Sequence, residues 1–70
     1  MFIVTQDRKA IVNTMNALYL EVIANEIRVI CFEKRITVGA YNTEERTRQV
    51  LEYIASSIAR NETIINLPEE

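Results

Sequence analysis

The chain has 70 residues, of which 49% are hydrophobic and 26% charged, with a formal net charge of −2 and no histidine. This length fits one domain, spanning residues 1–70, and the hydrophobic fraction is too high for an intrinsically disordered protein. The lack of histidine excludes Ser-His and Cys-His nucleophile pairs and histidine-based metal sites, and the net acidity disfavours general nucleic-acid binding.

Membrane insertion and secretion are not expected. No apolar run is longer than four residues, which is far too short to span a bilayer. The first residues lack the basic segment and the cleavable apolar stretch of a secretory signal. The one cysteine, Cys31, can form neither an intramolecular disulfide nor a zinc site, which fits a reducing compartment. We therefore expect a cytoplasmic protein with no membrane contact.

The first 16 residues predict a hairpin followed by a turn. Residues 2–5 and 10–12 are β-rich runs on either side of a polar turn at residues 6–9. Residues 13–16 contain two asparagines whose side chains can bond their own backbone, which indicates a second turn.

Three alternating runs follow and predict an antiparallel meander. They cover residues 17–24, 27–32 and 35–41, and two-residue breaks separate them. One face of this meander is apolar and is expected to pack on a helix. Its members are Leu18, Leu20, Val22, Ile27, Val29, Ile36 and Val38. Cys31 continues the same face, so we interpret it as a buried structural cysteine rather than a reactive thiol.

The period of the pattern changes at Asn42, where a helix is expected to begin. Asn42 is a suitable N-cap, and Glu45 follows three residues later, as in a capping box. The helix is expected to end near Arg60, with Asn61 as its stop. Its apolar stripe has spacings of three and four residues. The stripe consists of Val50, Leu51, Ile54 and Ile58, flanked by Thr47 and Ala55.

A last β-rich run at residues 63–67 ends at Pro68. The predicted fold class is therefore α+β. It combines an antiparallel β-meander of about five short strands, one C-terminal amphipathic helix packed on one face, and a short final strand.

One helix cannot cover both faces of a sheet, so the opposite face of the meander is a candidate interface. This face is predicted to carry Tyr19, Ile23, Ile30, Phe32 and Tyr41. The side chains could be scattered surface groups, or the N-terminal hairpin could fold over them. They could instead form one patch that meets a second copy or a partner, which is the interpretation we favour. An edge strand at residues 2–5 or 63–67 could also pair across a dimer.

The charged residues suggest little chemistry. Glu44 and Glu45 are adjacent carboxylates, but their place in a first helical turn, with Arg48 four residues after Glu44, is typical of helix stabilisation. Arg28 and Arg35 could share the aromatic face and hold a phosphate-bearing small molecule. We expect no catalytic residue, no metal site and no cofactor.

Several blocks of the chain resemble a known family. They are residues 2–7 (Phe-Ile-Val-Thr-Gln-Asp), 11–13, the Gly-x-Tyr-x-Thr-Glu-Glu-Arg block at 39–46 followed by Val50-Leu51, and residues 67–70. Together they resemble small uncharacterised proteins of phages and prophages of low-GC Gram-positive bacteria. The resemblance spans nearly the whole chain and departs at Thr47-Arg48, where a small residue and a lysine are expected. It implies an origin and a fold, and it supplies no catalytic or binding residues.

Phage accessory proteins of this size commonly act by stoichiometric binding, and this analogy shapes the functional expectation. We expect a non-enzymatic protein that binds and occupies a host protein, such as a defence factor, as a homo-oligomer. The alternative is an oligomer that sequesters a nucleotide-like small molecule through Arg28 and Arg35. A nucleic-acid binder is a weaker third hypothesis, and an enzyme is expected least.

Overall fold

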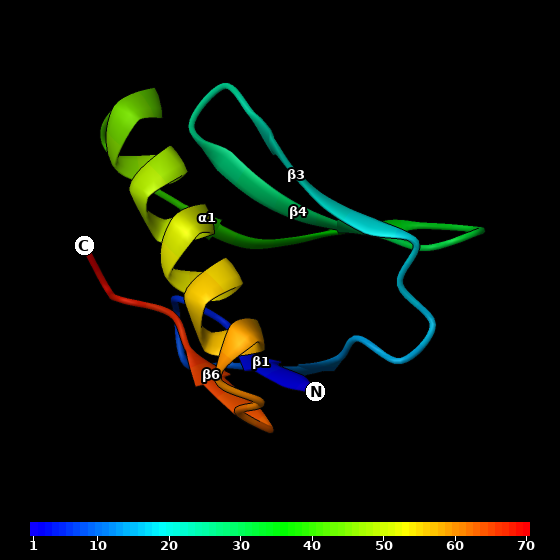
Figure 1. Cartoon of the computed structure of the whole chain (residues 1–70). Coiled ribbons are helices and arrows are strands. Elements are labelled where there is room, and N and C mark those ends of the chain that lie inside the picture. The colour runs from blue at the N-terminus through cyan, green and yellow to red at the C-terminus, as the bar shows by residue number, and fades with distance from the viewer.

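A computed structural model describes all residues, 1–70, and contains one helix and six strands arranged in two three-stranded sheets (Figure 1). The elements are β1 (Phe2–Val4), β2 (Ile11–Asn13), β3 (Tyr19–Ile23), β4 (Glu26–Ile30), β5 (Arg35–Ala40), α1 (Glu44–Ala59) and β6 (Ile64–Asn66). The α+β class is thus confirmed, with a meander, one helix packed on it and a short final strand.

The meander β3-β4-β5 is antiparallel throughout, as its alternating pattern predicts. Ile23 pairs with Glu26, so Ala24 and Asn25 form the loop between β3 and β4. The sequence placed this break one residue later. Ala24 adopts a left-handed conformation, with φ at 53°, which L-residues other than asparagine and glycine rarely visit.

A β-bulge interrupts the pairing of β4 with β5. Ile27 pairs with Gly39 and Arg28 pairs with Thr37, which leaves Val38 without a partner residue on β4. An extra residue in one strand reverses the face on which all later side chains lie. Beyond the bulge, therefore, the predicted face assignment of β5 no longer holds.

The second sheet joins the two ends of the chain. Its order is β2-β1-β6, and β1 pairs antiparallel with β2 and parallel with β6. The hairpin and the final strand predicted from the sequence are both present. However, the expectation that residues 2–5 form a free edge is wrong, because β1 is the central strand of this sheet.

Hydrogen bonds to Asp7 close the turn between β1 and β2. The Thr5 hydroxyl donates to Asp7 Oδ1 at 2.7 Å, and the Lys9 backbone N–H donates to the same oxygen at 2.9 Å. These two bonds, the Thr5 bond above all, hold the pKa of the Asp7 carboxyl below its usual value. Both hydrogen bonds therefore favour the ionised form of this carboxyl.

The two ends of α1 show one wrong and one confirmed prediction. Thr43 is the N-cap, and its hydroxyl oxygen accepts the backbone N–H of Arg46 at 3.0 Å. Asn42 lies outside the helix, and the residue three after the cap is Arg46, so the capping box is absent. At the other end Asn61 has φ at 59° and donates its N–H to the Ile58 carbonyl at 2.9 Å, as expected of a left-handed stop.

The buried side of α1 is slightly rotated from the predicted stripe. Its buried residues are Thr47, Val50, Ile54 and Ser57. Ile58, which the pattern placed on the stripe, is 48% exposed, and Ser57 is buried in its place. The helix has 16 residues, and no helix of the structure is long and apolar enough to cross a membrane.

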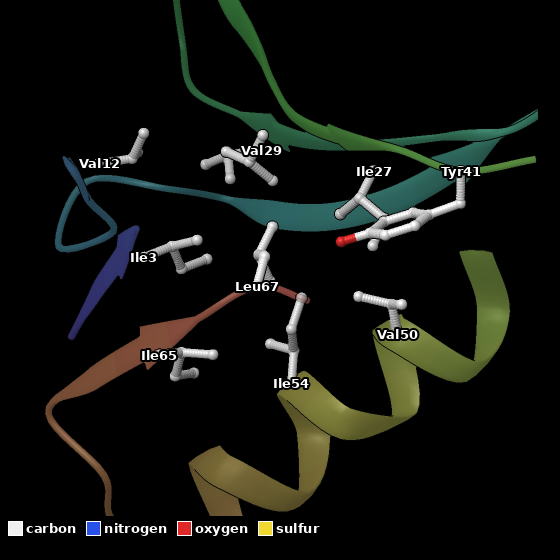
Figure 2. Packing of buried hydrophobic residues seen from close by; sticks show 10 residues of the cluster. Ile3, Val12, Ile27, Val29, Tyr41, Val50, Ile54, Ile65 and Leu67 are labelled. Carbon is white, nitrogen blue, oxygen red and sulfur yellow. The ribbon is translucent and has the colours of Figure 1, made fainter. Parts of the chain in front are cut away.

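One hydrophobic core lies between the two sheets and the helix (Figure 2). Thr47, at the buried N-terminal end of α1, donates its hydroxyl to the Thr43 carbonyl at 2.8 Å and lies 3.2 Å from the Asn25 carbonyl. The helix is thereby fixed to the β3–β4 loop. The core consists of Ile3, Val12, Ile27, Val29, Val38, Tyr41, Val50, Ile54, Ile65 and Leu67.

Candidate functional site

Tyr41, a predicted member of the aromatic interface, is buried in the core. The bulge turns its ring inward, where it lies among Ile27, Val50 and Leu67 (Figure 2) and is only 6% exposed. Gly39 leaves the space that the ring needs, since a Cβ atom at Gly39 would lie 3.1 Å from Cε2 of Tyr41. The assignment of Tyr41 to the outer face was therefore wrong.

The other four predicted interface residues differ in exposure. Tyr19 is 52% exposed, Ile23 40% and Phe32 86%, whereas Ile30 is only 8% exposed between its strand neighbours Tyr19 and Arg35. The outward positions of this sheet are Tyr19, Glu21, Ile23, Glu26, Arg28, Ile30, Arg35, Thr37 and Ala40. Four of these nine side chains are charged, so the outer face of the meander is not one continuous apolar patch.

Glu26 lies at the end of the central strand on this face and engages Arg28. Its Oε1 atom lies 3.1 Å from both Nε and Nη2 of Arg28, and it accepts the Thr37 hydroxyl at 3.2 Å. Arg35 lies beside Ile30 and forms no ion pair. Of the two guanidinium groups predicted to hold a phosphate, only Arg35 is thus without a carboxylate partner.

The most exposed aromatic side chain lies at the tip of the β4–β5 hairpin. Cys31 N–H donates to the Lys34 carbonyl at 2.9 Å and closes a loop in which Phe32 faces solvent. An open hollow beside Phe32 is lined by Leu18, Tyr19 and Ile30 and by the loop itself. We call this area the Phe32 surface, and it consists of Leu18, Tyr19, Phe32, Lys34 and Arg35.

The remaining predicted groups lie in the loop after β4 and along α1. Cys31, predicted to be buried within a strand, instead follows β4 and is half-buried, packed against the edge of the core. Glu44 forms an exposed ion pair with Arg48 at 3.3 Å, four residues along α1. No three histidine, cysteine, aspartate or glutamate side chains lie close enough together to hold a metal ion.

A second surface was not predicted at all. Ile3, Val12 and Ile65 point from the β2-β1-β6 sheet into the core (Figure 2), so the residues beside them face outward. None of these outward residues is charged. We call this area the uncharged face, and it consists of Phe2, Val4, Ile11, Asn13, Ile64 and Asn66.

The uncharged face is unusually apolar for a sheet surface. Phe2 is 42% exposed, Ile11 67% and Ile64 56%. A sheet with one buried face ordinarily alternates apolar and polar residues, so that its other face is polar. Adjacent apolar residues at 2–4 and 64–65 break that alternation. They are the signal in the sequence that both faces of this sheet are apolar.

Comparison of the chain with protein-family models, curated proteins and solved structures finds no match. The candidate binding residues therefore come from the geometry of this chain alone. Two surfaces are candidates for binding. The Phe32 surface carries two cationic side chains without an ion-pair partner, and the uncharged face carries no charged side chain.

Proposed function

We propose that this chain is a non-enzymatic binding protein that occupies another protein through the Phe32 surface. The observation that carries the proposal is the 86% exposure of Phe32. Exposing a phenylalanine side chain to water is unfavourable, and a bound partner that covers the ring removes this unfavourable free energy. Aromatic side chains also frequently dominate the binding energy at interfaces. Full burial of such a side chain is worth about 1.5–3 kcal/mol before association costs.

The charges around Phe32 indicate what the partner presents. Lys34 and Arg35 are exposed and form no ion pair, and Glu33 is the one carboxylate in the loop. A partner segment that places an apolar side chain against Phe32 and a carboxylate near Arg35 would complement this surface. The proposed ligand is therefore an acidic, partly apolar segment of a protein.

The nature of the partner follows from the resemblance described above. If the chain has the phage or prophage origin that its sequence blocks suggest, the partner is a host protein, and a defence factor is one such target. This part of the proposal rests on the analogy with small phage proteins, and the chemistry of the contact rests on the surface geometry.

The test compares the purified chain with two matched variants. Phe32→Glu places a carboxylate at the proposed contact, and Tyr53→Glu makes the same change at a 41% exposed aromatic residue on α1. Each tagged protein is incubated with bacterial lysate, and its complexes are analysed by native mass spectrometry. We expect a stoichiometric protein complex with the unchanged chain and with Tyr53→Glu, and a loss of at least about tenfold in binding with Phe32→Glu.

Two controls decide what a captured complex means. Arg35→Glu should also weaken it, and binding should fall as salt rises, because the proposed contact is partly electrostatic. A complex that survives both Phe32→Glu and Arg35→Glu would contradict the proposal. Capture of a small phosphate-bearing molecule instead of a protein, lost on Arg35→Ala, would favour the sequestering alternative.

A further inference from the structure

An open groove runs between β2 and β5, which are edge strands of the two sheets. A hollow of about 650 Å³ lies between β2 and the tip of the β4–β5 hairpin, and a hollow of about 310 Å³ continues it along β5. Both hollows are lined by Val12 and Ile36, so they form one groove, which we call the β2 groove. Val12 lies on the side of the core away from α1 (Figure 2).

The chain itself closes one end of the β2 groove. The Gln6 N–H donates to the Val38 carbonyl at 2.9 Å, and Gln6 Oε1 accepts the Ala40 N–H at 2.7 Å. Gln6 thereby joins the turn after β1 to the edge of β5. No hydrogen bond joins β2 to β5, so the groove stays open from there to the loop that carries Phe32.

The backbone of β2 has one unpaired edge. β2 pairs only with β1, and the Thr14 N–H donates to the Met1 carbonyl at 3.0 Å. Successive residues of an antiparallel strand bond alternately to its two sides, so Val12, like Thr14, bonds to β1. Ile11 and Asn13 therefore direct their N–H and C=O groups away from β1. No loop or side-chain hydrogen bond reaches these four groups, and both residues line the larger hollow.

We infer that this free edge of β2 accepts an extended segment of another polypeptide, which lies in the β2 groove and adds a fourth strand to the β2-β1-β6 sheet. The inference goes beyond the proposed function, because the backbone of β2 is no part of the Phe32 surface. Either one can fail without the other.

The groove also indicates what the segment carries. An edge of unpaired backbone groups is complementary to another extended backbone. Side chains alternate between the two sides of an added strand, so the residue opposite Val12 faces the hollow. The floor of the hollow is apolar, formed by Val12, Cys31 and Ile36, whereas Glu33 and Lys34 at its rim have opposite charges. The ligand is therefore a short extended peptide segment with one apolar anchor residue and no required net charge.

The probe is a display library of short random peptides, selected on the purified chain, so that no natural partner is required. We expect enriched peptides that share one apolar position flanked by residues of high strand propensity. The best peptide is synthesised with a fluorescent label, and its Kd is measured by fluorescence anisotropy. Failure to enrich any peptide would overturn the inference.

Proline at position 13 tests the backbone contact. Asn13→Pro removes an N–H that faces the groove, and an edge strand tolerates proline where the N–H bonds nothing. We expect the peptide to bind at least about tenfold more weakly, because a backbone hydrogen bond is lost and the proline ring blocks close approach. Asn13→Ala removes the side chain, which accepts the Met15 N–H at 2.9 Å, but keeps the backbone N–H. Its Kd should stay within about twofold of the unchanged chain's.

Asn66→Pro is the matched control at the other edge of the same sheet. The Leu67 N–H donates to the Val4 carbonyl at 3.3 Å, so the N–H of the preceding residue, Asn66, points away from β1. Asn66→Pro should bind the peptide as the unchanged chain does. Equal Kd values for the unchanged chain and Asn13→Pro would overturn the inference, as would equal losses for Asn13→Pro and Asn66→Pro.

N-methylation of the peptide keeps the inference falsifiable if Asn13→Pro fails to fold, which circular dichroism would reveal. Alternate N–H groups of an added strand face β2, so single N-methylations along the peptide should weaken its binding to the unchanged chain with a period of two residues. Weakening without that alternation would contradict strand addition. A dimer of the unchanged chain that Asn13→Pro separates, measured by sedimentation, would assign the edge to a second copy and overturn the proposed occupant.

Discussion

The Tyr41 hydroxyl donates a 2.7 Å hydrogen bond to the backbone carbonyl of Pro68. This bond joins the residue that follows β5 to the segment that follows β6, and so connects the meander to the C-terminal end of the chain. The Arg46 guanidinium lies 5.9 Å from the centre of the same ring and donates to the Glu70 carbonyl at 2.7 Å. Tyr41 is therefore a structural residue that fixes the C-terminal segment against α1.

Replacing Tyr41 with phenylalanine tests that role. Tyr41→Phe keeps the ring in the core and removes only the hydroxyl that bonds Pro68. We expect the free energy of unfolding in urea to fall by about 1 kcal/mol, the usual net worth of one hydrogen bond. Tyr53→Phe is the control, since Tyr53 is exposed on α1 and makes no side-chain hydrogen bond, and its unfolding midpoint should not change.

The same residue makes stability depend on alkaline pH. Burial raises the pKa of Tyr41 above its ordinary value of 10.0, although the positive charges of Arg46 and Arg8 oppose this. A raised pKa means that the folded protein holds the phenolic proton more tightly than the unfolded chain. This contribution to stability is complete below pH 10 and is lost as the pH rises through the folded-state pKa.

A comparison of variants isolates that contribution. Unfolding free energies measured from pH 8 to 12 should fall more steeply for the unchanged chain than for Tyr41→Phe, which has no phenolic proton to lose. Parallel curves for the two proteins would show that Tyr41 does not contribute to the alkaline loss of stability.

The position of the helix cap predicts different effects for substitutions at two neighbouring residues, Thr43 and Asn42. Thr43→Ala removes the oxygen that accepts the Arg46 N–H, and it should lower the free energy of unfolding by about 1 kcal/mol. Asn42→Ala should change it by less than about 0.5 kcal/mol, because the Asn42 side chain makes no hydrogen bond. Thermal unfolding of both variants measures the two losses of stability. A larger loss for Asn42→Ala than for Thr43→Ala would show that Asn42 is the cap, as the sequence analysis expected.

The left-handed conformation of Ala24 predicts a stabilising substitution. Ala24→Gly removes the clash between Cβ and the backbone at φ 53° and should raise the free energy of unfolding by up to about 1 kcal/mol. Ala40→Gly makes the same change in β5, where φ is ordinary, and should destabilise the protein. Calorimetric melting temperatures that moved in the same direction for both variants would refute the strain at Ala24.

Local patterns predicted much of this fold. The alternation of residues 17–41 predicted the meander, and the spacing of Val50 and Ile54 predicted the buried side of the helix. Asn61 marked the helix end through its tolerance of positive φ. These features depend on residues close together in the chain, so the sequence carries them directly.

The candidate surfaces were predicted less well, because each depends on a non-local event. The bulge opposite Ile27 turned Tyr41 from the outer face into the core. The alternation of β5 cannot reveal this, since a bulge is set by the pairing of two strands. The Arg28–Glu26 pair, by contrast, is local to β4, and it was missed because the sequence analysis placed Glu26 in the preceding turn.

The sequence by itself determined the α+β class, the meander and the helix, because short-range backbone periodicity specifies them. Only the tertiary structure decided which surfaces remain exposed. The pairing of Phe2 with Ile64 brings opposite ends of the chain into one sheet and assembles the uncharged face from three separate segments. No local pattern contains that contact, because it arises from the burial of Ile3 and Ile65 in the common core.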